Sequence, residues 1–241
     1  MSKDRNIAIC LAAGKGKRMN SDTAKQYMSI GDKPVLYYCL KAFEDSFIDG
    51  VVIVTAKDDI EYVRREIVNK YKLSKVTAIV EGGKERYHSV MCGLNAIDEC
   101  DYVYIHDGAR PFINNEILER AYDTVKKYKT AIVAMPVKDT IKIVDTDGCA
   151  VETPDRSSVY MMQTPQVFSY KEIKEAYMEM IDKEDELLNR GVKITDDAMV
   201  MEEMGSLKVH VSEGDYRNIK ITTPEDIVVA EAFLGVKNPI Y

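Results

Sequence analysis

The stretch that decides the fold is Ile7-Ala8-Ile9-Cys10-Leu11-Ala12-Ala13, which runs directly into Gly14-Lys15-Gly16-Lys17-Arg18. A short apolar run of this kind is typical of a buried strand, and the two glycines indicate a loop at its end. The backbone N–H groups of such a loop approach phosphate oxygens closely, and cations there neutralise the phosphate. Four cations lie within eleven residues, namely Lys15, Lys17, Arg18 and Lys25. This pattern predicts a site for an anionic ligand, with a plain strand-to-helix turn as the alternative.

Two common phosphate-binding motifs do not describe this loop. The pattern G-x-x-x-x-G-K-[ST] is absent, and Met19 occupies the position at which G-x-G-x-x-G requires its third glycine. The second departure disfavours a dinucleotide-dependent dehydrogenase.

Length and composition limit the class of protein. The chain has 241 residues, an ordinary size for one α/β domain spanning 1–241, and its 33 basic and 40 acidic side chains give a net charge of −7. An acidic chain is a poor general binder of nucleic acid, because that binding depends largely on neutralising phosphates. The five scattered cysteines contain no C-x-x-C pair, and no apolar run reaches about eighteen residues. We therefore expect a cytoplasmic protein with no nucleic-acid or membrane partner.

Short apolar runs alternate with amphipathic segments along the chain. The runs that predict strands are 7–13, 51–56, 76–81, 102–106, 131–137, 208–212 and 219–221. The segments that predict helices are 34–44, 58–70, 85–97, 115–127, 171–180 and 196–204, followed by a last helix with Thr223 as its N-cap and Pro224 as its first residue. This alternation predicts a Rossmann-like α/β fold, with a mostly parallel twisted sheet and helices on both faces.

Residues 138–160 interrupt this alternation. They alternate only weakly around Asp145-Thr146-Asp147-Gly148, a sequence typical of a hairpin turn. An isolated two-stranded hairpin is marginally stable in water, so another surface should cover it. We expect an arm inserted into the domain and covered either by a second subunit or by the protein's own sheet.

Polar and glycine-rich segments follow several of the predicted strands. In a parallel α/β sheet, ligands bind outside the carboxyl ends of the strands, so these segments should meet at one site. The segments are 14–18, 81–86, 106–111, 138–140, 195–197 and 218–220.

Two charged residues in these segments have distinctive positions. Asp107 follows the apolar run 102–105, where a carboxylate near phosphates suits Mg²⁺; its alternatives are an N-cap and an ion pair with Arg110. Lys220 lies between two isoleucines of a predicted strand, a position in which a cation needs a ligand or a partner. The three histidines show no metal-ligand spacing, and no Ser-His-Asp or Cys-His arrangement supports acyl chemistry.

Taken together, these segments resemble the 2-C-methyl-D-erythritol 4-phosphate cytidylyltransferase family. The matching runs follow the family's order and span nearly the whole chain: Ala12-Ala13-Gly14-x-Gly16-x-Arg18-Met19, Lys25-Gln26-Tyr27, Gly82-Gly83-x-x-Arg86-x-x-Ser89-Val90, His106-Asp107-x-Ala109-Arg110-Pro111, Pro136-Val137-Lys138-Asp139-Thr140-Ile141-Lys142, Thr164-Pro165-Gln166, Thr195-Asp196-Asp197-Ala198 and Asn218-Ile219-Lys220-x-Thr222. Ala24 departs from the proline that usually precedes Lys-Gln-Tyr, and Gly108 stands where alanine is common. Neither change removes a functional group.

The resemblance implies transfer of CMP from CTP to methylerythritol phosphate, with Mg²⁺ and a homodimer that exchanges its arms. It implies catalytic roles for Arg18, Lys25, Arg156 and Lys220. It implies nucleotide contacts from Ala12, Ala13, Gly14, Gly16, Gly82, Gly83, Lys84, Ser89 and Gly108. It implies substrate contacts from Asp107, Arg110, Thr140 and Thr195, with Asp107 also the metal ligand.

Two alternatives remain beside this interpretation. The closest is a cytidylyltransferase for another polyol phosphate, notably ribitol 5-phosphate; residues 140–142 and 153–156 favour methylerythritol phosphate because they look more like that family's arm. The other is a non-catalytic nucleotide sensor, which the joint presence of Arg18, Lys25, Arg156 and Lys220 disfavours.

Overall fold

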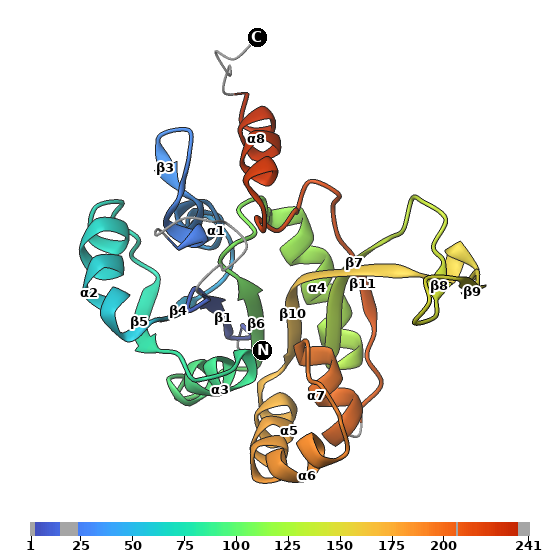
Figure 1. The fold of residues 1–241 in the computed structure, drawn as a ribbon. Coiled ribbons are helices and arrows are strands. Elements are labelled where there is room, and N and C mark those ends of the chain that lie inside the picture. Colours follow the sequence, from blue (N-terminus) through green and yellow to red (C-terminus); the bar gives the residue numbers. More distant parts are fainter. Residues whose placement is uncertain (1–2, 15–23, 206, 236–241) are drawn as a thin grey trace.

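A seven-stranded sheet forms the centre of the computed structural model, which describes residues 3–14, 24–205 and 207–235. The strands lie in the order β11–β7–β10–β6–β1–β4–β5 (Figure 1). Their bounds are Asn6–Leu11 (β1), Gly50–Thr55 (β4), Val76–Glu81 (β5), Tyr102–Asp107 (β6), Thr130–Pro136 (β7), Tyr160–Ser169 (β10) and Val211–Glu213 (β11). β10 is antiparallel to both of its neighbours, whereas the other adjacent pairs are parallel. The predicted mostly parallel sheet is confirmed.

Helices surround this sheet. They are Val35–Glu44 (α1), Ile60–Tyr62 (α2), Arg86–Asn95 (α3), Asn115–Tyr128 (α4), Tyr170–Asp182 (α5), Glu184–Asn189 (α6), Asp197–Met204 (α7) and Pro224–Phe233 (α8). Shorter elements are Lys25–Tyr27 (η2), Lys57–Asp59 (η3), Val63–Asn69 (η4), Arg156–Ser158 (η5) and the small hairpin of Ser29–Ile30 (β2) and Lys33–Pro34 (β3). α8 begins as predicted, because Thr223 and Asp226 form a capping box around Pro224. Within the described ranges, no helix is long and apolar enough to cross a membrane.

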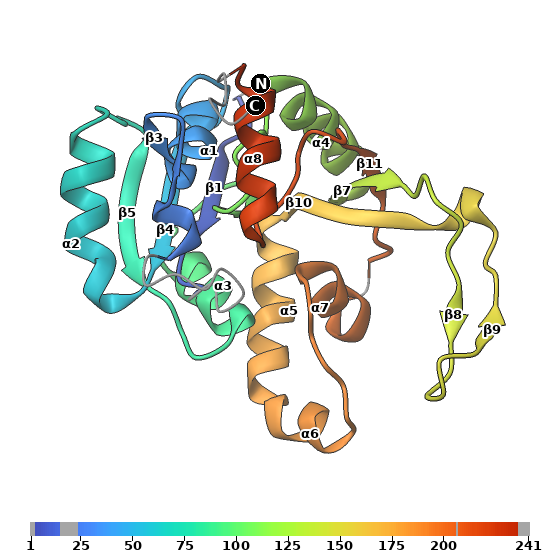
Figure 2. The same cartoon turned by 45° about the horizontal axis from the view of Figure 1, so that its top comes forward.

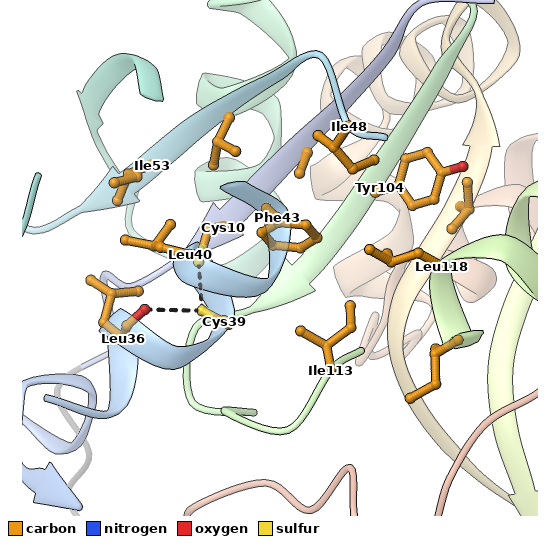
Figure 3. Close-up of a cluster of buried hydrophobic side chains, with 14 of the residues drawn as sticks. Cys10, Leu36, Cys39, Leu40, Phe43, Ile48, Ile53, Tyr104, Ile113 and Leu118 are labelled. Atoms are coloured by element: carbon orange, nitrogen blue, oxygen red, sulfur yellow. Dashed lines mark hydrogen bonds between the residues drawn. The ribbon is translucent and has the colours of Figure 1, made fainter. Parts of the chain in front are cut away.

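Alternate residues of each strand enter opposite faces of the sheet, and helices cover both faces. Ala8 and Cys10 of β1 belong to a buried cluster with α1 and α4, in which Phe43 and its neighbours are fully enclosed (Figure 3). Ile7 and Ile9 belong to a second buried cluster with α3, α5 and α7. Because side chains along a strand point alternately to the two faces of the sheet, the apolar run of β1 contributes residues to both buried clusters. The prediction of helices on both faces is confirmed.

One predicted strand is wrong and one strand is missing from the prediction. Residues 219–221 form no strand; Ile221 instead packs in a small apolar cluster with Ala230 of α8. β10 is the missing strand: it contains Pro165, a residue disfavoured in central strands, at the place where its pairing with β7 is irregular. The predicted helical segment at 58–70 is confirmed, as the succession of η3, α2 and π-helical η4.

The segment 138–160, which we call the arm, leaves the sheet between β7 and β10 and projects away from the helices (Figures 1 and 2). Its tip is a hairpin of Ile143–Val144 (β8) and Ala150–Glu152 (β9), as the sequence predicted. Gly148 has a φ of +82°, which closes the turn at little cost for glycine. Val144 and Val151 are 57% and 62% exposed, so the arm is not covered by the protein's own sheet.

Candidate functional site

A cavity of about 630 Å³ opens at the carboxyl ends of β1 and β6. This is the end of a parallel sheet at which ligands are expected to bind. Thirteen residues line the cavity: Leu11, Ala13, Gly14, Lys25, Gln26, Gly83, Lys84, Glu85, Arg86, Ser89, Asp107, Ala109 and Lys220. They come from segments that are far apart in the sequence, and four of them are cations.

The first wall of the cavity is formed by the end of β1 and by η2. The Gln26 side chain is buried and donates a hydrogen bond to the Ala12 carbonyl. Next to it, the Tyr27 hydroxyl and the Thr55 hydroxyl lie 2.6 Å apart. These bonds tie η2 to the sheet and so place Lys25, at the start of η2, on the cavity wall.

The second wall is the loop between β5 and α3. The backbone N–H of Gly83 donates to the Ser89 hydroxyl at 3.1 Å, and Glu85 with His88 forms a capping box at the start of α3. A Cβ on Gly83 would lie 2.3 Å from the Cβ of His88, so only glycine fits this turn against the helix. The loop therefore places Gly83, Lys84 and Glu85 on the cavity wall.

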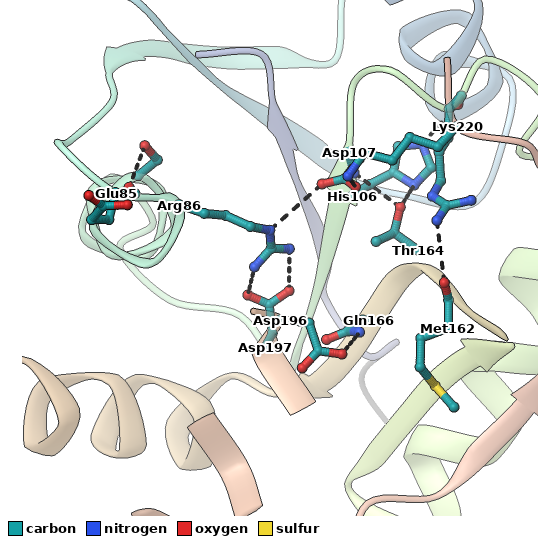
Figure 4. Close-up of polar contacts among 12 residues, drawn as sticks. Glu85, Arg86, His106, Asp107, Met162, Thr164, Gln166, Asp196, Asp197 and Lys220 are labelled. Atoms are coloured by element: carbon teal, nitrogen blue, oxygen red, sulfur yellow. Dashed lines mark hydrogen bonds and ion pairs between the residues drawn. The ribbon is translucent and has the colours of Figure 1, made fainter. Parts of the chain in front are cut away.

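Asp107, the last residue of β6, lies on the floor of the cavity (Figure 4). Its Oδ2 is 2.6 Å from Lys220 Nζ, its Oδ1 is 3.8 Å from Arg86 Nε, and its side chain is 13% exposed. Burial alone would raise the pKa of the Asp107 carboxyl, but Lys220 and Arg86 hold that pKa well below its usual range. The site thus contains a carboxylate that stays ionised at neutral pH, flanked by two cations.

Arg86 also makes two hydrogen bonds to Asp197, the first residue of α7. Its Nη1 and Nη2 each lie 2.7 Å from one oxygen of that carboxylate, which is fully buried. The Tyr177 hydroxyl donates to the same carboxylate at 2.6 Å. This contact joins the start of α3 to the start of α7 across the floor of the cavity.

Arg110 lies beside the cavity and is held by backbone carbonyls. Its guanidinium donates to the carbonyl of Asn218 at 2.7 Å and to that of Met162 at 3.4 Å. Burial lowers the pKa of Arg110, against the opposing effect of Asp107. Within the described residues its buried Nε has no hydrogen-bond partner.

The structure brings together only part of the set that the sequence singled out. Eight of those residues line the cavity: Ala13, Gly14, Lys25, Gly83, Lys84, Ser89, Asp107 and Lys220. Three others, Ala12, Gly82 and Gly108, do not line it but are chain neighbours of lining residues. Gly16 and Arg18 lie outside the described residues.

Three predicted residues lie away from the cavity of this chain. Thr140 and Arg156 are exposed on the arm, where Arg156 Nη1 donates to the Lys138 carbonyl at 3.1 Å. Thr195 is exposed before α7, and its hydroxyl contacts the sulfur of Met199.

Sequence reasoning assigned no role to three residues at the site, Gln26, Arg86 and Asp197. Arg86 and Asp197 both occur in the quoted motifs, but a charged residue in a loop is ordinarily solvated. Their pairing across 111 positions of sequence is a tertiary contact. A signal was nevertheless present, since Asp197 precedes the apolar run Ala198–Met201 and has to be buried with it.

Asp107 is the carboxylate of the cavity best placed to meet a divalent cation, because it is ionised and partly exposed. Within the described residues, no three His, Cys, Asp or Glu side chains are grouped so that they could hold a metal ion by themselves. Mg²⁺ is commonly held by one or two carboxylates together with substrate phosphates. The ionised Asp107 in a cavity lined by four cations fits that arrangement, in which the ligand supplies the remaining oxygens.

Comparisons with known proteins agree with this geometry. A family model described as 2-C-methyl-D-erythritol 4-phosphate cytidylyltransferase matches residues 6–236. A relative of that name from Lachnospira eligens is 51% identical over 230 residues, covering 95% of this chain and 99% of the relative. One from Lachnoclostridium phytofermentans is 49% identical, covering 96% and 97%.

Solved structures give the same result. The crystal structure of 4-diphosphocytidyl-2C-methyl-D-erythritol synthase from Anaerococcus prevotii superposes with a TM-score of 0.82 at 36% identity, over 96% of both chains. The enzyme from Francisella tularensis superposes with a TM-score of 0.76 at 27% identity, over 95% of this chain and 99% of that one. The chain therefore belongs to the 2-C-methyl-D-erythritol 4-phosphate cytidylyltransferase family.

Proposed function

We propose that this chain transfers the cytidylyl group of CTP to 2-C-methyl-D-erythritol 4-phosphate. The products are 4-(cytidine 5'-diphospho)-2-C-methyl-D-erythritol and pyrophosphate. The observation that supports this most strongly is that one cavity is lined by four cations, Lys25, Lys84, Arg86 and Lys220, together with the ionised Asp107. Such a cavity suits two phosphorylated ligands whose negative charges have to be brought together.

The reaction needs no general base. A phosphate monoester has its second pKa near ~6, so the substrate phosphate is largely dianionic at neutral pH. One of its oxygens attacks the α-phosphorus of CTP, and the bond from that phosphorus to the bridging oxygen breaks. The electron pair leaves with pyrophosphate, and no proton has to move. Catalysis then consists of positioning and of fixed positive charge at the developing negative charge.

The nucleotide half of the site is formed by the end of β1, by η2 and by the glycine loop. Ala13, Gly83 and Ser89 provide a close wall for the cytosine and ribose, and Lys84 lies beside them. Lys25 offsets the charge that builds up on the α-phosphate and on the leaving pyrophosphate. We assign Arg18 to the same task from the family resemblance.

We assign the substrate half of the site to Lys220 and Arg110, and to Thr195 from the family resemblance, although Thr195 does not line the cavity of this chain. Lys220 holds the attacking phosphate in line with the α-phosphorus. Thr140 and Arg156 complete the set, but in this chain they lie on the exposed arm. We therefore infer that the arm of a second subunit brings them to this cavity, in a homodimer that exchanges its arms.

A divalent cation, Mg²⁺ by the family resemblance, would be held by Asp107 together with the triphosphate. When bound, it would neutralise phosphate charge and orient the triphosphate. Lys220 and Arg86, which flank Asp107 here, would then share that carboxylate with the cation.

Pyrophosphate release tests the proposed function. The purified protein is assayed with CTP, ATP, GTP and UTP against both methylerythritol 4-phosphate and ribitol 5-phosphate. We expect release with CTP and methylerythritol phosphate at a much higher kcat/KM than with any other pair. Preference for ribitol 5-phosphate would instead indicate the alternative substrate, and binding of CTP with no pyrophosphate release would indicate a nucleotide sensor.

A further inference from the structure

Arg86 lies between two carboxylates that have different surroundings (Figure 4). It makes two 2.7 Å hydrogen bonds to Asp197, whose side chain has no exposed surface, and only a 3.8 Å contact to Asp107 at the cavity. A guanidinium and a carboxylate in this two-bond geometry form one of the strongest pairings available to side chains. The carboxylate of Asp197 therefore offsets much of the positive charge of Arg86, although Arg86 still contributes to lowering the pKa of Asp107.

Asp197 is itself fixed in position. It is the first residue of α7, whose N-cap Asp196 accepts a hydrogen bond from the backbone of Met199. The side chain of Asp196 also accepts from Gln166 of β10 at 2.9 Å. The Tyr177 hydroxyl of α5 donates to the Asp197 carboxylate itself, whereas Gln166 of β10 holds the neighbouring N-cap, so both the start of α7 and the carboxylate are fixed in place. Its direction, and so the direction of Arg86, is set by the fold and not by a ligand.

The consequence for Asp107 is electrostatic. Asp107 already has Lys220 at 2.6 Å as a close counter-ion. If Asp197 did not take up the charge of Arg86, two full cations would face one carboxylate. That carboxylate would then attract a divalent cation much less strongly, since like charges at such distances in a poorly solvated site repel strongly.

We infer that Asp197 is a positioning residue of the reaction: it orients Arg86 and offsets its positive charge, so that less positive charge beside Asp107 opposes the binding of the divalent cation of the substrate complex. This inference rests on the proposed function, because it takes Asp107 as the ligand of the cation. It adds a fully buried residue that does not line the cavity and acts through Arg86, which does. It also gives a reason for the buried carboxylate of Asp197 next to a cavity that we propose to bind anions.

The test is the effect of the metal on nucleotide binding. The affinity of the full-length protein for α,β-methylene CTP, which cannot transfer its cytidylyl group, is measured by calorimetry with and without Mg²⁺. The ratio of the two affinities is the metal enhancement. For Asp197→Asn we expect this ratio to fall about tenfold, in line with the effect of removing groups that support metal ligands. The metal-free affinity should rise, because the released Arg86 then attracts the triphosphate, and a higher Mg²⁺ concentration should restore part of the metal-dependent binding.

Two further variants separate charge from structure. Arg86→Gln removes the cation and leaves Asp197 charged, so the metal enhancement should rise, opposite in sign to Asp197→Asn. Tyr177→Phe removes a hydrogen bond from Asp197 but no charge, so the enhancement should stay within about twofold of the unmodified protein. If Asp197→Asn does not fold, the rise expected for Arg86→Gln and the unchanged ratio for Tyr177→Phe still decide the matter.

Equal losses of affinity with and without metal in all three variants would show a merely structural contact and overturn the inference. The variant Asp107→Asn shows whether a negative result concerns only the role of Asp197 or the proposed metal site itself. If Asp107→Asn abolishes the enhancement and Asp197→Asn leaves it unchanged, only the role of Asp197 is wrong. If Asp107→Asn itself leaves the enhancement intact, Asp107 is not the metal ligand, and both assignments are overturned.

Discussion

The cavity around Asp107 and the arm at 138–160 are assigned to one reaction, but they are held in place in different ways. In the cavity, Asp107 and Lys220 are positioned by contacts within the chain, including the 2.6 Å ion pair between them. On the arm, Thr140 and Arg156 are exposed, and Arg156 contacts only the arm's own backbone at Lys138 among the described hydrogen bonds. The comparison teaches that the cavity is preorganised by the fold, whereas the residues proposed for the other half lie on an arm outside the cavity of this chain.

The largest expected effect concerns the preorganised half. Lys25→Ala should lower kcat about 10²–10³-fold, as removal of a single charge-stabilising donor does in comparable sites, with a much smaller change in the KM for CTP. Steady-state pyrophosphate release measures both constants. Lys33→Ala is the matched control, because Lys33 is outside the cavity and pairs with Asp32. Turnover near that of the unmodified protein in Lys25→Ala would remove Lys25 from the catalytic set.

The second prediction tests whether the cavity residues and the arm residues of one active site come from different subunits. Arg156→Ala and Lys25→Ala should each be nearly inactive, but mixing them after subunit exchange should restore activity. In a two-fold symmetric dimer with exchanged arms, a mixed dimer has one site with both residues intact, so an equal mixture should regain about a quarter of the sites. Activity is followed against time of mixing, with exchange verified by mass spectrometry of differently tagged subunits.

If each arm served its own chain, every site in a mixed dimer would still lack one of the two residues. Absence of recovery after verified exchange would therefore contradict the exchanged arm. Mixing Lys25→Ala with Lys220→Ala is the internal control, because both residues line the cavity of one chain and no site in their mixed dimer regains both.

A smaller effect is expected where the two halves meet at the attacking phosphate. Lys220→Ala should raise the KM for methylerythritol phosphate about tenfold, the loss expected for one hydrogen bond to a charged group, and raise the KM for CTP much less. Arg217→Ala is the control, since Arg217 is an exposed cation in the same loop whose side chain reaches Phe233 instead of the cavity. An unchanged KM for the polyol phosphate would exclude Lys220 as its ligand.

The smallest effect is on stability and concerns the preorganised half alone. Because Lys220 and Arg86 hold the pKa of Asp107 below its unfolded value, despite the opposing effect of burial, ionised Asp107 stabilises the folded protein above that unfolded value. This contribution should be lost as the pH falls below about 4, toward the folded pKa. The free energy of unfolding of the protein and of Asp107→Asn, measured in urea between pH 7 and pH 3, should therefore converge at low pH. Adding Lys220→Met to both proteins should reduce that pH dependence, and a difference that does not vary with pH would contradict the coupling.

Much of the fold follows from local sequence pattern. The strands at 51–56 and 102–106 and the helix at 115–127 were predicted within one or two residues at each end, because apolar period and capping residues act over short distances. The failures have a common cause. In both cases tertiary packing outweighs the local pattern. Pro165 is disfavoured in a central strand but lies within β10, and the alternation of Ile219 and Ile221 is typical of a strand although both residues pack in a cluster with α8.

The sequence by itself determined the α/β fold, the glycine loop against α3, the hairpin of the arm and the family to which the chain belongs, since these depend on residue types at short spacing. Only the tertiary structure decided that Arg86 would meet Asp197, that Lys220 would pair with Asp107, and that Arg156 would lie exposed far from the cavity of its own chain. The physical reason is that an ion pair depends on distance in space. Chain positions more than a hundred residues apart come within 3 Å only when the whole sheet and its helices are packed.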